Sequence, residues 1–172
     1  SLGSESLQKS LIATLVGLVS VIIFMVIYYR WLGVVASVAL IFYTLLTFAI
    51  FKFVPVTLTL AGIAGFVLSI GMAVDANILI FARMKEEIKS GKGVSKAVEE
   101  GFARAWQSIR DSNFNSLIVC AILFIFATSF VKGFAFTLSL GILLSMFSAI
   151  FITRILLMVV IGAWTEKLKW LL

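Results

Sequence analysis

The chain has 172 residues, of which 62% are hydrophobic and 13% are charged, with a net charge of +6 and a mean hydropathy of +1.19. Soluble domains carry about 25% charged residues, so this composition excludes an ordinary water-soluble domain. We expect no nucleic-acid partner, because the cations lie beside long apolar runs, where they set topology and contact anionic lipid. The chain has no histidine, and we expect no metal site, no cofactor and no enzyme active centre.

Apolar runs of near 20 residues follow one another along the chain. A helix needs about 20 apolar residues, at 1.5 Å per residue, to cross roughly 30 Å of hydrocarbon. Unpaired backbone groups are not tolerated in lipid, and the runs do not alternate as barrel strands do, so we predict helices. The predicted fold class is an all-α integral membrane protein, one domain of about five transmembrane helices. The predicted spans are 7–28, 34–51, 56–81, 112–131 and 134–153.

Short turns are predicted between most of these spans. Gly33 should turn the chain into the second span, Pro55 marks the loop before the third, and Lys132-Gly133 should turn the chain into the fifth. The tail, 155–172, is predicted to lie at the membrane interface.

The only long polar stretch, 82–110, is predicted to be cytoplasmic and to form two short helices separated at Gly91-Lys92-Gly93. After that break apolar residues recur at steps of three and four, which indicates one apolar helical face. This helix is predicted to lie along the membrane interface or to pack under the bundle. A docking site for a cytoplasmic partner is the alternative.

Positive residues are distributed unevenly between the two sides of the membrane. Of the 14 Lys and Arg residues, eleven fall on the side of segment 82–110 and three on the other, namely Lys9, Lys52 and Lys132. The positive-inside rule then places the N-terminus of this chain outside and its C-terminus in the cytoplasm. The chain begins without a methionine or a basic region, so we expect no signal peptide and a fragment of a longer protein.

Asp75 is the principal candidate functional residue. It lies about six residues from the cytoplasmic end of the third span, or roughly 9 Å into the membrane. A carboxylate there costs on the order of 2.5–3.5 kcal/mol, and desolvation favours its neutral form. We therefore predict that Asp75 loads and releases protons near neutral pH. An aspartate held by a hydrogen bond or an ion pair, with no transport role, is the alternative.

Small residues line one face of the third span and one face of the fifth, and such stripes let helices approach closely. Gly71 lies one turn before Asp75 and leaves room for water or a partner side chain. The predicted packing residues are Gly62, Gly65, Ser69, Gly71, Ala73 and Ala76 in the third span and Thr137, Gly141, Ser145 and Ser148 in the fifth. We expect these two spans to be the central pair, and the hydroxyls of the fifth could also line a polar path.

Three other polar residues are weaker candidates for a proton relay. Asn77 could hydrogen-bond between helices, as could Asn113 and Asn115. Asp111 precedes the fourth span, where capping of the helix N-terminus is the preferred interpretation. Arg154 is expected to reach the interface as an anchor, with a coupling role as the alternative.

Four strings carry a family resemblance: LTLAGIAG at 58–65, GMAVDANILIFAR at 71–83, IRDSN at 109–113 and VKGFAFTL at 131–138. They resemble the SecD/SecF family of protein-export membrane proteins, in the resistance–nodulation–division superfamily, and its SecD members in particular. The resemblance covers nearly the whole chain in order. The chain departs from the family pattern at Ala61, at Ala82, and in the strings 114–116 and 127–129.

The resemblance implies the last five helices of SecD, in a bacterial or archaeal plasma membrane, without the first helix and the periplasmic domain that follows it. It implies SecF and the SecYEG translocon as partners. The exported preprotein would be contacted mainly through the missing periplasmic domain, and membrane lipid would surround the chain. It also implies export driven by proton flow, with Asp75 in the place of the family's membrane aspartate. The alternatives are a drug or lipid transporter of the superfamily, sodium coupling, and a structural scaffold that conducts nothing.

Overall fold

The computed structural model describes residues 2–54 and 59–164, and the regular structure in these ranges is helical. Five helices of the described chain are long and apolar enough to cross a membrane, which confirms the predicted fold class. The elements are α1 (Leu2–Tyr29), α2 (Trp31–Phe53), α3 (Leu60–Lys89), α4 (Val94–Phe126), α5 (Ser129–Phe147), the π-helical segment η1 (Ser148–Thr153) and α6 (Arg154–Trp164). The last three follow one another without a turn.

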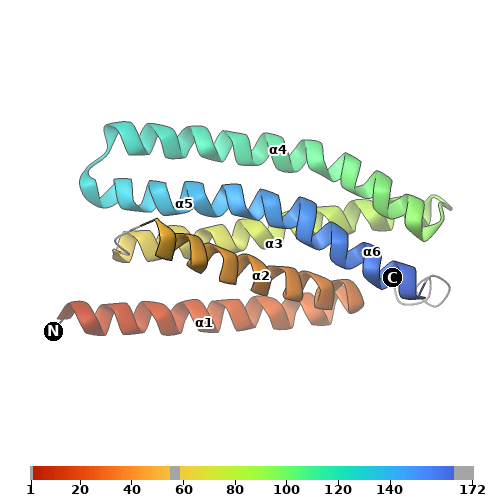
Figure 1. Ribbon diagram of the computed structural model, residues 1–172, viewed down its shortest axis with the longest axis horizontal. Helices are drawn as coiled ribbons and strands as arrows, with labels where there is room; N and C mark the ends of the chain where they lie inside the picture. The colour runs from red at the N-terminus through yellow and green to blue at the C-terminus, as the bar shows by residue number, and fades with distance from the viewer. Residues whose placement is uncertain (1, 55–58, 165–172) are drawn as a thin grey trace.

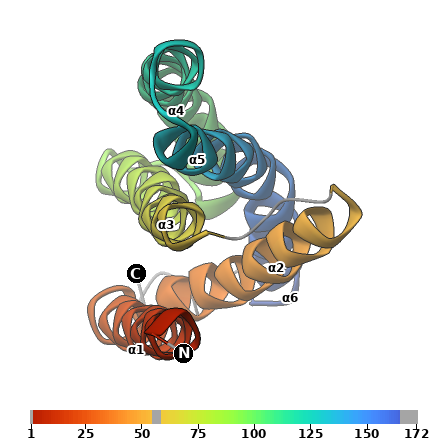
Figure 2. The same ribbon diagram turned by 90° about the vertical axis from the view of Figure 1, so that its left-hand side faces the viewer.

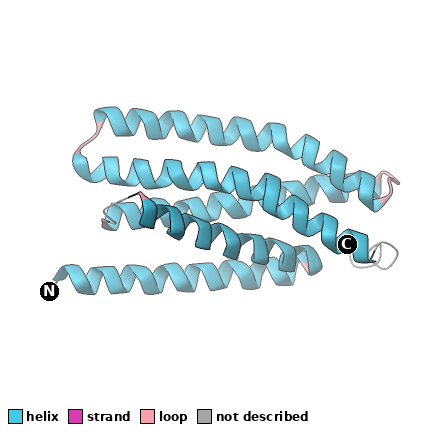
Figure 3. Ribbon diagram, viewed as in Figure 1, coloured by secondary structure: helices cyan, strands magenta, loops and turns pink. Residues whose placement is uncertain are grey.

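The long helices run side by side and alternate in direction (Figure 1). The turns after α1 and α3 therefore lie at the same end of the bundle as the end of α6, and the end of α2 and the turn after α4 lie at the other end. Viewed from one end, α3 and α5 lie between α4 on one flank and α1 and α2 on the other (Figure 2). Within the described ranges, short loops join α1 to α2, α3 to α4 and α4 to α5 (Figure 3). The contact between α3 and α5 is the most extensive, so these helices are the central pair.

Small residues explain how closely α3 and α5 approach. A Cβ atom at Gly65 would lie 2.7 Å from the carbonyl oxygen of Phe134, and a Cβ atom at Gly141 would overlap the side chain of Ser69. The other buried members of the two stripes are Gly62, Ala73, Ala76, Thr137, Ser145 and Ser148. Gly71 is different, because a Cβ atom there would meet nothing within 4 Å in the described chain.

Two of the predicted turns are wrong. Arg30, with φ of 49°, makes the turn between α1 and α2, whereas Gly33 lies inside α2. A Cβ atom at Gly33 would overlap the backbone carbonyl of Met25, so this glycine serves helix contact. The last turn lies at Ala127 and Thr128, because α4 ends at Phe126 and α5 already includes Lys132-Gly133.

The polar stretch 82–110 does not form two separate short helices. It continues α3 to Lys89 and then supplies the first half of α4, because Ala, Arg, Met, Lys and Glu after Phe81 all favour continued helix. The two extensions form a hairpin, called here the α3–α4 hairpin, which turns at residues 90–93 at one end of the bundle (Figure 1). The predicted apolar face of α4 is buried in it, and the backbone of Gly101 meets Met84. The predicted apolar face thus packs within the hairpin, against α3.

Candidate functional site

Asp75 lies on the face of α3 that the bundle leaves open. The small-residue stripe of α3 is turned toward α5, so Gly71 and Asp75, one turn apart, are both exposed. Asp75 makes no hydrogen bond or ion pair with any residue in the described parts of the chain. A charged carboxylate inside the membrane without a partner in its own chain raises the free energy of the protein, unless water solvates it, a proton neutralises it or another subunit pairs with it.

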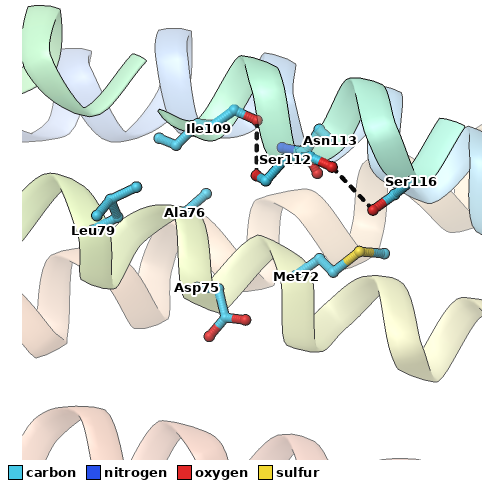
Figure 4. A pocket seen from close by; sticks show the side chains of 8 residues that line it. All are labelled: Met72, Asp75, Ala76, Leu79, Ile109, Ser112, Asn113 and Ser116. Carbon is cyan, nitrogen blue, oxygen red and sulfur yellow. Dashed lines mark hydrogen bonds between the residues drawn. The ribbon is translucent and has the colours of Figure 1, made fainter. Parts of the chain in front are cut away.

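A cavity of about 200 Å³ lies between α3 and α4 beside this aspartate (Figure 4). Its walls combine apolar side chains with hydroxyl, amide and carboxylate groups. The lining residues are Met72, Asp75, Ala76, Leu79, Ile109, Ser112, Asn113 and Ser116. A space of this size holds several water molecules, since one needs only about 10–15 Å³ of such volume.

The polar side chains of the cavity differ in whether they have a hydrogen-bond partner within the protein. Ser112 donates to the backbone carbonyl of Ile109 at 3.1 Å, and Ser116 donates to that of Ser112 at 3.1 Å. The side chain of Asn113 has no hydrogen-bond partner among the described residues, so its amide is open to water in the cavity. Figure 4 shows that the Asp75 carboxylate points away from α4. Proton exchange with the cavity therefore requires rotation of the Asp75 side chain or bridging water.

Asn77 is buried and lies apart from this cavity. Its side-chain oxygen accepts a hydrogen bond from Thr153 at 2.8 Å, which joins α3 to the last residue of η1. A π-helical segment is rare in proteins and occurs often at functional sites. The hydrogen bond between helices expected of Asn77 is therefore present, and it fixes the π-helical segment against the helix that carries Asp75.

A second buried polar contact crosses the centre of the bundle. Tyr43 of α2 and Ser69 of α3 share a hydrogen bond of 2.6 Å, and the Tyr43 hydroxyl also donates to the carbonyl of Gly141 at 3.3 Å. Thr137 likewise donates to the carbonyl of Gly62 at 2.9 Å. Thr137 thus serves a contact between helices, whereas the Ser145 hydroxyl donates to the carbonyl of Ile142 in its own helix at 2.8 Å.

The remaining predicted candidates do not join Asp75. Asp111 lies in the middle of α4, not before it, because the helix begins at Val94. Capping by Asp111 is therefore wrong, and its carboxylate instead accepts a hydrogen bond from the neighbouring Arg110 at 2.9 Å. Arg154 is exposed and lines a different cleft, between α4 and η1.

An ion cluster that sequence reasoning missed holds the α3–α4 hairpin together. The side chain of Glu87 on α3 is only 3% exposed and accepts hydrogen bonds from Lys92 in the turn and from Arg104 on α4. Lys92 also bonds to Glu100, and its bonds to Glu100 and Glu87 raise the pKa of the Lys92 ammonium group. No local signal in the sequence distinguished Glu87 from its exposed neighbour Glu86.

Comparison with known proteins gives a consistent result. Residues 1–163 match the family model described as the C-terminal part of the protein-export membrane protein SecD/SecF. Protein translocase subunits SecD from Thermobaculum terrenum and Dehalococcoides mccartyi are 53% and 55% identical over 99% and 97% of this chain. The chain spans only 34% and 38% of the length of these two relatives.

A solved structure is similar as well. The crystal structure of SecDF, a translocon-associated membrane protein from Thermus thermophilus, superposes with a TM-score of 0.89 at 37% identity. The similarity covers 91% of this chain and 22% of that one.

Proposed function

Because the chain belongs to the SecD/SecF family of protein-export membrane proteins, as its C-terminal membrane part, we propose that it uses the proton-motive force to assist protein export. In this proposal it works with SecF and the SecYEG translocon, and the exported preprotein is the cargo. The N-terminus of the chain lies outside and the α3–α4 hairpin in the cytoplasm, as the excess of cations on the hairpin side favours.

The observation that carries the proposal is the state of Asp75. The carboxylate is exposed on an open helix face, has no partner among the described residues, and adjoins a cavity with three polar α4 side chains. A structural aspartate would instead be held by a hydrogen bond or an ion pair, as Asn77 is by Thr153. An aspartate that alternates between charged and neutral forms needs access to water and a neighbouring surface that responds to its charge.

The open face also supports a partner half in the membrane. Gly71 and Asp75 present a shallow, unfilled surface, and α1 is exposed over most of its length. A second bundle of helices such as SecF would cover the carboxylate and strengthen its electrostatic effect by excluding water. Each proton that crosses 100 mV supplies about 2.3 kcal/mol. That energy shifts a two-state equilibrium by roughly fiftyfold.

The test is the substitution Asp75→Asn in the complete complex with SecF and SecYEG, reconstituted in proteoliposomes. Asparagine keeps the shape and hydrogen-bonding capacity but cannot ionise, so we expect normal insertion and folding with loss of the export that depends on a proton gradient. Glu86→Gln is the matched control, since this acid is exposed and paired with Arg83 outside the predicted span. Full gradient-dependent export by Asp75→Asn would overturn proton carriage and leave the scaffold function. Stimulation by a sodium gradient alone would identify sodium as the coupling ion.

A further inference from the structure

A second cleft, of about 440 Å³, lies between α3, α4, η1 and the start of α6, and its α4 residues lie nearer the start of that helix than those of the Asp75 cavity. Its volume is in the range of small-molecule sites, about 300–1,000 Å³. Most of its surface is apolar or aromatic, and two charged side chains border it. The lining residues are Ile80, Glu99, Phe102, Ala103, Trp106, Ile109, Ile150, Phe151, and Arg154. Ile109 contributes to the walls of both cavities.

The two charges of the cleft have opposite sign and are both unpaired. Glu99 and Arg154 are exposed, and neither forms a hydrogen bond or an ion pair within the described residues. Their neighbours behave differently: Glu100 pairs with Lys92, and Arg104 with Glu87. A guanidinium binds a phosphate with two parallel hydrogen bonds, whereas a carboxylate accepts hydrogen bonds from an ammonium group.

The position of the cleft fits the membrane boundary. Ile80 lies at the end of the predicted third span and Ile109 just before the predicted fourth, so the floor is at the edge of the hydrocarbon region. Glu99 lies nearer the start of α4 than Ile109 does, in the part of the helix that belongs to the hairpin. A cleft between helices at this depth is within reach of lipid head groups, and its one guanidinium and one carboxylate match a head group that carries both charges. The half-buried Trp106 ring is the residue type that favours this depth.

We propose that this cleft binds one glycerophospholipid with a phosphoethanolamine head group. The phosphate binds Arg154, the primary ammonium donates to Glu99, and the upper part of one acyl chain lies along Trp106, Ile150 and Phe151. An anionic lipid satisfies Arg154 but places a negative head group beside Glu99. A phosphocholine lipid carries the positive charge but has no N–H to donate. The charge pair thus favours phosphatidylethanolamine over both.

Trp106 supplies the readout. In a variant of the 172-residue chain with Trp31, Trp164 and Trp170 changed to Phe, Trp106 is the remaining tryptophan. Lipids with brominated acyl chains quench a tryptophan that they touch, so mixed vesicles give the relative affinity of each head group at this cleft. We expect brominated phosphatidylethanolamine to be preferred about fivefold over phosphatidylcholine, the scale of one exposed ion pair, and also over phosphatidylglycerol.

Two substitutions separate the charges. Glu99→Gln should abolish the preference over phosphatidylcholine and reverse that over phosphatidylglycerol, because Arg154 alone then selects the anionic lipid. We expect the unchanged chain to retain one phospholipid through detergent exchange, as counted by native mass spectrometry. Arg154→Gln should lose that phospholipid. The control is Arg110→Gln, which removes a cation of α4 that is paired with Asp111 and does not line the cleft.

Several outcomes would refute the proposal. Equal quenching by the three lipids would mean ordinary solvation by the bilayer. A preference for phosphatidylglycerol in the chain with Glu99 intact would mean a general basic surface. Quenching that begins only after deletion of residues 165–172 would mean that the tail of the chain fills the cleft.

Discussion

Single polar side chains divide into two groups in this membrane bundle. Tyr43, Ser69, Asn77 and Thr153 are buried and bonded to one another in pairs across helices. Asp75 and Asn113 have no such partner among the described residues and border a cavity. The first group fixes the geometry of the bundle, and the second group leaves polar atoms open to water or to a partner.

The bond between Asn77 and Thr153 can be tested by a double-mutant cycle with Asn77→Ala and Thr153→Ala. Each change leaves a buried polar group without its partner, so each should lower the free energy of unfolding by about 1–3 kcal/mol. The coupling energy should be about 0.6 kcal/mol and not above about 1.7, the range for hydrogen bonds between transmembrane helices. The free energy of unfolding in mixed micelles is measured for the unchanged chain, the two single variants and the double variant. A coupling energy of zero would mean that the two side chains do not interact in the membrane.

Sequence reasoning found Asp75 because an acid in an apolar run is visible locally. It could not find Thr153 as the partner of Asn77, because the two residues are 76 positions apart and the stripe of small residues suggests several helix rotations. The same limit applies to Tyr43, whose partners lie 26 and 98 positions away. Which polar residues meet is decided by helix rotation and tilt, and those depend on the packing of the whole bundle.

At the scale of elements, hydropathy identified the five long helices but not all of their ends. Gly33 and Gly133 both suggest turns, yet both lie inside helices, where the missing side chain lets another segment approach. Glycine permits a turn and permits close helix contact, and sequence alone does not separate these uses. Helices α3 and α4 also extend beyond the predicted spans without a break, so the change from apolar to polar residues does not mark a helix end.

The α3–α4 hairpin should depend on the buried carboxylate of Glu87. Glu87→Gln removes the negative charge that Lys92 and Arg104 share, so we expect faster amide hydrogen exchange in residues 82–104. Exchange in α5 should stay unchanged, because that helix does not contribute to the cluster. Glu86→Gln, which removes only an exposed pair with Arg83, should have little effect. Equal exchange in the two variants would show that apolar packing alone holds the hairpin.

At the scale of the whole molecule, the alternation of the helices separates the charges. The end of the bundle that carries the α3–α4 hairpin also carries Arg30, in the turn after α1, whereas Lys132 lies near the opposite end, in the first turn of α5. This distribution favours one orientation strongly, since cations are retained on the cytoplasmic side during insertion. It also places the Asp75 cavity and the proposed lipid cleft toward the same side of the membrane, with Ile109 shared between their walls.

The orientation is tested by single cysteines at the two ends, in a chain whose buried Cys120 is changed to Ala. Ser90→Cys lies in the exposed turn of the hairpin, and Thr128→Cys lies at the exposed start of α5, where the threonine makes no capping hydrogen bond. Ser90→Cys removes the hydrogen bond of 2.7 Å from the Ser90 hydroxyl to the backbone carbonyl of Glu87, but it keeps the ion pairs of the Glu87 carboxylate, one of which a cysteine at Lys92 would remove. With a membrane-impermeant maleimide added to intact cells, we expect labelling at position 128 only, and labelling at position 90 after the membrane is opened. The reverse pattern would invert the topology, because Asp75 would then lie near the outer face and the cavity beside it would take protons from the outside.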